Sequence, residues 1–186
     1  MVNIQNDDIL LDRIINGETD LYNHIIEKYK SYTFTIALNI LNNREDAEEA
    51  TQDSFIKAYQ HLKSFNRQSK FSTWLYRIVF NTSVSYKRKQ KVKKETLETI
   101  KYTYYEGHSS EMEIKDQQKY IHEALQKLLE LDRTVITLFY LKEFSLEEIS
   151  EIINLNVNTV KVRLHRARKR LADEIKTMLK EEALNL

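Results

Sequence analysis

The chain has 186 residues, of which 41% are hydrophobic and 31% charged, with 2 Gly, 0 Pro and 0 Cys. This length suits one domain or two small ones, and the apolar content is enough to bury a core, which argues against intrinsic disorder. Sheet-rich folds need tight turns built on Gly and Pro, so the near absence of both predicts an all-α chain. The lack of Cys excludes a disulfide framework, a thiolate zinc site and a cysteine nucleophile.

The N-terminus carries two acidic residues, Asp7 and Asp8, before a short apolar run, which is the reverse of a signal peptide. No stretch approaches the roughly 18 apolar residues of a membrane-spanning helix. We therefore expect a cytoplasmic protein with no stable membrane insertion.

Helical periodicity predicts four helices in the first half of the chain. A short helix ends at Gly17, a second spans 21–41, and a third begins near Glu45. The fourth begins at Phe71, after the basic loop 64–70, and loses its apolar pattern in the run YKRKQKVKK. These helices form the first predicted domain, residues 1–89.

A polar stretch with few apolar positions, residues 90–117, is interpreted as a flexible linker. Apolar periodicity resumes at Ile121 and predicts a second helical domain, residues 118–186. Within it, Ser145 and Glu148 form a capping box that begins a short helix over 146–153. Asn156 can cap a second helix after a three-residue turn, and this pattern is typical of a helix-turn-helix.

The net charge of +1 conceals a strong sorting of charge along the chain. Acidic residues gather over 45–53, none occurs from 54 to 94, and that acid-free stretch interleaves Lys and Arg with aromatic residues. A second basic block spans 161–170. One such block can be an ordinary solvated helix face, but two in a nearly neutral chain favour nucleic-acid binding.

The helix that follows the turn has an apolar side and a polar side. At about 100° per residue, Val160, Leu164, Ala167 and Leu171 share the inward side. The outward side carries Asn158, Val162, His165, Arg166 and Lys169, flanked by Lys161, Arg163, Arg168 and Arg170. This layout suits a helix in the DNA major groove, while a basic helix against a protein or membrane surface stays open as an alternative.

Three segments carry a specific combination of motifs: EDAEEATQDSFIKAYQHLKSF at 45–65, FSTWLYRIVFNTSVSYKR at 71–88 and SLEEISEIINLNVNTVKVRLHRARKRL at 145–171. In this order and separation they resemble the extracytoplasmic function (ECF) family of bacterial RNA polymerase sigma factors. The resemblance implies two small helical domains, sigma domain two and sigma domain four, joined by a flexible linker. It implies a factor that binds core RNA polymerase and directs promoter-specific initiation without cofactor or metal.

The resemblance also assigns roles by position. Asp46, Glu49, Gln52, Asp53 and Phe55 fall on the polymerase-binding segment. Trp74 and Asn81 fall where the family captures an extruded base of the minus-ten element, and Lys70, Arg77, Lys87 and Arg88 would hold phosphates. Lys161, Arg163, His165 and Arg166 occupy positions that read the minus-thirty-five element, with Asn158 and Lys169 beside them on the DNA-facing side.

Several of these residues have plainer interpretations. An aromatic residue at helical spacing, such as Trp74, can belong to the core, and His165 can be an ordinary surface residue.

The resemblance also implies a partner. The family is commonly held inactive by an anti-sigma factor, so such a partner is expected here too.

Two other functions are alternatives to this one. An enzyme would rest only on the acidic cluster, and the five scattered His residues have no metal-ligand spacing. A simple helix-turn-helix regulator would bind duplex DNA alone, but it has no need of an acidic face beside an acid-free basic stretch.

Overall fold

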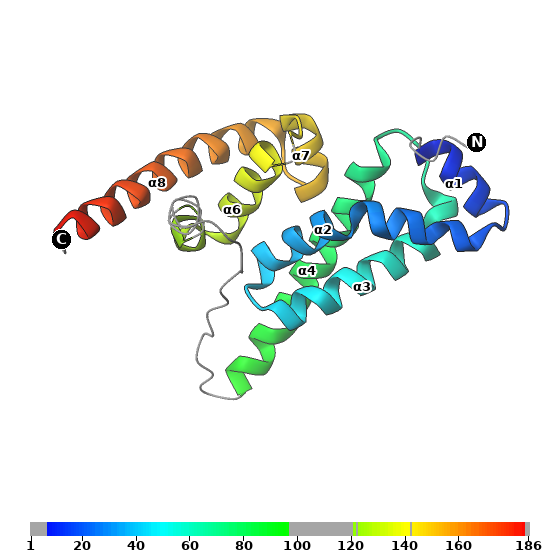
Figure 1. Ribbon diagram of the computed structural model, residues 1–186, viewed down its shortest axis with the longest axis horizontal. Helices are drawn as coiled ribbons and strands as arrows, with labels where there is room; N and C mark the ends of the chain where they lie inside the picture. Colours follow the sequence, from blue (N-terminus) through cyan, green and yellow to red (C-terminus); the bar gives the residue numbers. More distant parts are fainter. Residues whose placement is uncertain (1–6, 97–120, 122, 142, 185–186) are drawn as a thin grey trace.

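The computed structural model describes residues 7–96, 121, 123–141 and 143–184, and every regular element within them is helical (Figure 1). In chain order the elements are α1 (Asp7–Ile15), the short turn η1 (Thr19–Leu21), α2 (Tyr22–Leu41), α3 (Arg44–Gln60), η2 (Leu62–Ser64), α4 (Phe71–Thr96), α6 (Glu130–Ile136), the π-helical turn η3 (Thr137–Leu141), α7 (Leu146–Ile153) and α8 (Val157–Leu184). The all-α prediction is confirmed.

Helices α2, α3 and α4 pack against one another and form the N-terminal unit (Figure 1). Their fully buried side chains include Ile25, Ile36, Leu75 and Val79. The hydroxyl of Tyr22 donates a hydrogen bond of 2.7 Å to the main-chain oxygen of Phe55, which joins α2 to α3 inside the core. Apolar faces at helical spacing therefore produce the predicted bundle.

Local signals set the helix boundaries of this unit. Gly17 has a φ of 110°, a left-handed conformation that ends the α1 segment where the sequence predicted a stop. The Asn43 side chain accepts a hydrogen bond of 2.9 Å from the main-chain N–H of Asp46, so α3 begins one residue before Glu45. Asn residues thus serve as caps where a chain poor in Gly needs them.

Helix α4 is longer than predicted. It continues to Thr96, beyond the expected domain boundary at residue 89 and into the first part of the expected linker. Lys, Arg and Gln are good helix formers, and no Gly or Pro interrupts the run, so the helix persists after the apolar pattern ends. The rest of the expected linker, 97–117, lies outside the described residues.

The C-terminal unit packs α6 and α7 against α8, with Val135, Ile149, Ile152 and Val160 fully buried. Ser145 and Glu148 form the predicted capping box at the start of α7. Asn154 ends α7 in the left-handed conformation, and the Asn156 side chain accepts a hydrogen bond of 2.8 Å from the N–H of Asn158. The helix-turn-helix is therefore formed as the sequence predicted.

The two units contact each other, which the sequence did not predict. Helix α7 packs on α4 and α6 packs on α2 (Figure 1). Tyr76 and Phe144 meet edge to face with ring centroids 5.6 Å apart. Arg133, only 1% exposed, donates a hydrogen bond of 3.0 Å to the main-chain oxygen of Asn39. Burial lowers the pKa of the Arg133 guanidinium, so its hydrogen bonds offset a desolvation cost.

The cap of α7 gives the first prediction. Replacing Ser145 with Ala removes an acceptor for a helix N–H, so we expect the free energy of unfolding to fall by about 1 kcal/mol, measured by urea titration with far-UV circular dichroism. Ser150→Ala is the matched control, because the Ser150 hydroxyl bonds only within the helix, to the Glu147 carbonyl. Equal losses in the two variants would contradict the capping role.

Candidate nucleic-acid and polymerase interfaces

Most side chains predicted to contact the minus-ten element lie on one stripe of the N-terminal unit. Their spacing of four, three, four and seven residues repeats on one side of a helix with about 3.6 residues per turn. All except the partly buried Trp74 are exposed. The stripe consists of Lys70, Trp74, Arg77, Asn81 and Arg88.

Trp74 belongs partly to the core and partly to this stripe. Its ring centroid lies 5.1 Å from that of Phe65 and 5.6 Å from that of Phe71, in tilted packing. The indole is half-buried rather than enclosed. Core packing therefore fixes the ring while leaving part of it at the surface, beside Asn81 two turns further along.

Two of the residues predicted to contact phosphates, Lys70 and Lys87, form ion pairs with the C-terminal unit. The Lys70 ammonium lies 2.9 Å from a carboxylate oxygen of Glu148 in α7. Lys87 donates a hydrogen bond of 3.0 Å to the main-chain oxygen of Ile40 and forms an ion pair with Glu130 in α6. Lys87 lies on a different side of α4 from the stripe, so the structure does not bring it together with the other predicted residues.

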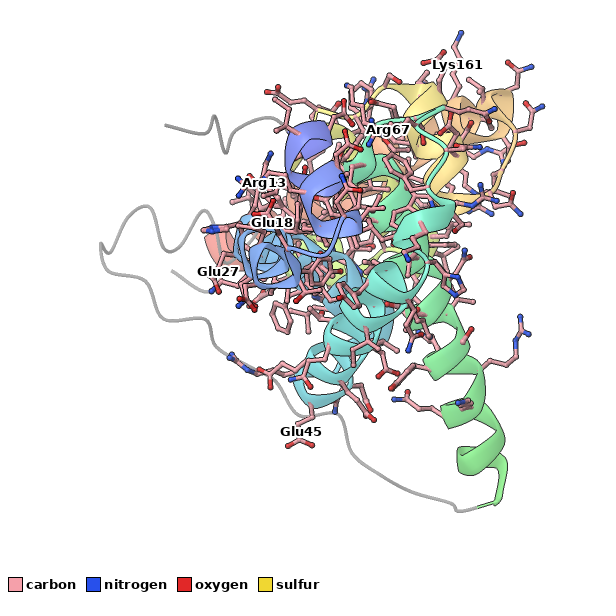
Figure 2. The ribbon with its side chains drawn as sticks, turned by 90° about the vertical axis from the view of Figure 1, so that its right-hand side faces the viewer. Arg13, Glu18, Glu27, Glu45, Arg67 and Lys161 are labelled. Carbon is pink, nitrogen blue, oxygen red and sulfur yellow. The ribbon has the colours of Figure 1, made fainter. Side chains whose placement is uncertain are left out.

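The outward side of α8 is arranged as the periodicity predicted. The side chains of Asn158, Lys161, His165, Arg166 and Lys169 are all exposed, whereas Val160, Leu164 and Ala167 are buried. Figure 2 shows Lys161 at the edge of the molecule, pointing away from it. The polar and basic side of the second helix of the motif is therefore free of packing within the chain.

The flanks of α8 differ from this outward side. Arg163 and Arg170 each place a guanidinium nitrogen 2.8 Å from a carboxylate oxygen of Asp132, and the Asp132 side chain is 3% exposed. On the other flank, Arg168 lies over the rings of Phe139 and Tyr140, 5.2 Å from each centroid. Arg163, expected from the resemblance to read bases, thus faces α6.

The acidic segment forms a separate surface on α3. Glu49 and Gln52 are exposed and Asp46 is partly exposed. The Asp53 carboxylate accepts a hydrogen bond of 2.6 Å from the Tyr86 hydroxyl of α4. Phe55 is 4% exposed, so its side chain packs in the core and adds nothing to this surface.

In the view of Figure 2, Lys161 on α8 lies at the top and Glu45, at the start of α3, lies well below it. Burial and the hydrogen bond to Asp53 raise the pKa of Tyr86, so its hydroxyl stays a donor over the physiological range. The bond between Tyr86 and Asp53 thus joins α4 to α3.

Sequence reasoning missed Asp132 and Arg133, two charged residues that are almost completely buried. The sequence does carry a signal for them. Asp132 and Arg133 stand in the mostly apolar segment 128–141, where neighbouring apolar side chains favour burial. No group of three or more potential metal ligands occurs within the described residues. No helix in that part of the chain is both long and apolar enough to cross a lipid bilayer.

Comparison with known proteins follows this division of the chain. The Sigma-70 region 2 family matches residues 25–92, and the Sigma-70, region 4 family matches residues 118–171. The ECF RNA polymerase sigma factor SigW of Bacillus subtilis is 34% identical over 182 residues, covering 90% of this chain and 96% of SigW. The chain belongs to the ECF sigma factor family. As an ECF sigma factor it is a transcription initiation factor that acts with RNA polymerase at promoters, and it is not an enzyme.

Other sigma factors are similar at greater distance. The ECF RNA polymerase sigma-E factor of Haemophilus influenzae is 29% identical, covering 93% of this chain and 97% of its own length. Among solved structures, the sigma factor RpoE in complex with the anti-sigma factor NepR from Bartonella quintana matches with a TM-score of 0.71 at 23% identity, over 83% of this chain and 96% of that one. CnrH in complex with the cytosolic domain of CnrY matches with a TM-score of 0.65 at 21% identity, over 91% and 96%. These structures support the ECF sigma fold.

The contact between Lys70 and Glu148 gives a pH prediction. Burial opposes ionisation of Glu148, but the hydrogen bonds from Lys70 and from the Ser145 N–H outweigh it and hold the pKa of the carboxyl below its usual value. A lowered native pKa adds stability that is present above the unfolded pKa, about 4.3, and is lost as pH falls through the native value. We expect Glu148→Gln, which can still cap α7, to flatten the dependence of the urea midpoint on pH between about 6 and 3.

Glu147→Gln is the control for this measurement, because it removes the neighbouring exposed carboxylate without touching Lys70. A wild-type pH dependence in Glu148→Gln, or an equal flattening in both variants, would contradict the role given to Glu148.

Proposed function

We propose that this sigma factor recognises the minus-ten element of its promoter through the stripe on α4 and the minus-thirty-five element through the outward side of α8. The observation that carries the proposal is the segregation of charge: two exposed basic surfaces lie on separate units, and an acidic surface on α3 is distinct from both. A DNA-binding regulator acting alone needs only the basic surfaces. We propose that residues 1–89 and 118–186 are the two functional domains.

At the minus-ten element, an extruded base needs a stacking surface and a hydrogen-bonding partner. The half-buried Trp74 ring can supply the first, and the exposed Asn81 amide, with both donor and acceptor atoms, can supply the second. Arg77 and Arg88, on the same stripe, are suited to the flanking phosphates. Lys70 can join them once its ion pair with Glu148 opens.

At the minus-thirty-five element, α8 would enter the major groove with its N-terminal turns foremost. Arg166 and Asn158 can make paired hydrogen bonds to base edges, since guanidinium and amide groups match purine donor and acceptor patterns. Lys161 and Lys169 are suited to phosphates on either strand, and His165 lies between them. Polymerase contact would use Asp46, Glu49 and Gln52 on α3, without the buried Phe55 side chain.

The contact between the units bears on this function. The two promoter elements are centred near positions −35 and −10, about 25 base pairs apart. At about 3.4 Å per base pair this separation is about 85 Å of duplex. Units that touch through α4 and α7 are too close together to occupy both elements, so promoter binding requires them to separate. A cytoplasmic partner could act by holding them together, and two of the similar solved structures are complexes, one with an anti-sigma factor and one with a cytosolic domain. We therefore expect an anti-sigma factor for this protein.

Run-off transcription tests the proposal. Fragmented genomic DNA is transcribed by sigma-free core RNA polymerase with and without the protein, and transcript starts are sequenced. Protein-dependent starts that share two spaced upstream elements are the expected result. No new starts and no complex with core polymerase, together with binding to duplex DNA alone, would favour the helix-turn-helix regulator.

Polymerase binding depends on the acidic surface in this proposal. We expect the double variant Asp46→Asn, Glu49→Gln to weaken core binding at least about tenfold, because each lost contact to a basic partner is worth about 1 kcal/mol. Fluorescence anisotropy of the labelled protein titrated with core enzyme measures it. The control, Asp20→Asn with Glu27→Gln, removes the same charge from exposed sites outside α3 and should bind like the wild type.

Base reading by Arg166 gives a further prediction. Replacing Arg166 with Ala should cost about 1 to 3 kcal/mol of minus-thirty-five binding and relax preference at one base position. A panel of single-base-pair substitutions in the promoter, assayed with the holoenzyme, measures the preference. A uniform loss across the panel would reduce Arg166 to a phosphate contact.

A further inference from the structure

Asp132 is a buried carboxylate held between two arginines of the DNA-binding helix. Its side chain is 3% exposed, and its two oxygens each accept a hydrogen bond of 2.8 Å, one from Arg163 and one from Arg170. A buried carboxylate requires such partners, because removing its charge from water is unfavourable unless the charge is paired. Asp132 lies on α6, whereas both arginines lie on α8.

The spacing of the two arginines makes this contact a geometric restraint. Seven residues separate Arg163 from Arg170, which is almost two turns, so both lie on the same flank and about 10 Å apart along the axis of α8. One carboxylate that binds both therefore fixes the rotation of α8 about its axis and its position along that axis. On the opposite flank, Arg168 over Phe139 and Tyr140 limits rotation in the other direction.

Rotation of α8 decides which side chains reach DNA. Each residue occupies about 100° of the helix, so a rotation of a few tens of degrees moves the outward side chains off the base edges they would read. The exposed residues Arg166, His165 and Lys169 are correctly directed only while the flanks stay fixed.

Arg163 is better suited to this restraint than to reading bases. Its Nε atom is buried without a hydrogen-bond partner, and its Nη1 atom is bound to Asp132. Turning the side chain toward DNA would break its bond to Asp132 and leave that almost completely buried carboxylate with one partner, Arg170, at a cost in stability.

We propose that Asp132 is a positioning residue for promoter recognition, which clamps Arg163 and Arg170 and so sets the rotation of the reading helix. The inference rests on the proposed minus-thirty-five function of α8. The Asp132 carboxylate also offsets part of the positive charge of the two arginines, which weakens their attraction to phosphates. Asp132 therefore supports sequence preference in two ways: it fixes the direction of the outward side chains of α8, and it reduces the positive charge that Arg163 and Arg170 present to DNA.

The test uses Asp132→Asn in the full-length protein bound to core polymerase. The specific probe is a duplex enriched by the wild-type holoenzyme from a random-sequence library, and the competitor is an unrelated duplex of equal length. We expect the ratio of specific to unspecific affinity to fall about tenfold, as for loss of one base contact. We also expect unspecific binding to strengthen. The slope of log affinity against log salt concentration should become more negative by about 1 to 2, because each freed arginine can neutralise a phosphate.

Three further variants separate positioning from folding. Glu174→Gln is the matched control. Glu174 lies on α8 and forms an ion pair of 3.3 Å with Lys127, without contacting Arg163 or Arg170. The affinity ratio of this variant should stay at the wild-type value. Asp132→Glu should recover part of the ratio. Arg170→Gln breaks one arm of the clamp at a side chain that is 52% exposed, so it should keep the fold and still lower the ratio even if Asp132→Asn unfolds.

The outcomes are distinct. An unchanged ratio and salt slope in folded Asp132→Asn, or an unchanged ratio in Arg170→Gln, would overturn the clamp while leaving the promoter function intact. A wild-type holoenzyme that enriches no sequence upstream of the minus-ten element would overturn the proposed function of α8, and the clamp with it.

Discussion

Helix α4 is the element on which the rest of the structure depends, because its sides are divided among the bundle, α7 and solvent. One side, with Leu75 and Val79, packs into the bundle formed with α2 and α3, and a neighbouring side, with Tyr76, receives α7. The remaining stripe faces solvent and carries the basic and amide side chains. A helix divided in this way has few positions that can change without affecting a second surface.

The division also explains how strongly opposed charges coexist on adjacent helices. The acids of α3 and the cations of α4 lie mostly on exposed sides of their helices, whereas the sides that pack into the bundle carry buried residues such as Ala50 and Val79. Where polar groups do cross between them, the contacts are hydrogen bonds of fixed geometry: Tyr86 donates to Asp53, and Lys57 donates to Thr82 at 3.1 Å. Each surface therefore keeps its sign and can attract its own partner.

The sequence was most informative where local physics decides the structure. The capping box at Ser145, the cap at Asn156 and the apolar spacing from Val160 are signals within a few residues, and they predicted α7 and the start of α8 correctly. Contacts between distant segments leave no such signal. The clamp on Asp132 spans 31 residues to Arg163, and the bond from Arg133 to Asn39 spans 94, so neither could be located from periodicity.

The acceptor that Arg133 uses on α2 is a main-chain oxygen rather than a side chain. Every residue type that could stand at position 39 provides that oxygen, so substitution there cannot remove the bond as long as the helix persists. Substitution at position 39 would remove the separate side-chain bond from Asn39 to Thr137 but would leave the Arg133 bond intact, and no compensating change at position 133 would accompany it. A bond of this kind can persist through divergence without leaving a pair of correlated substitutions.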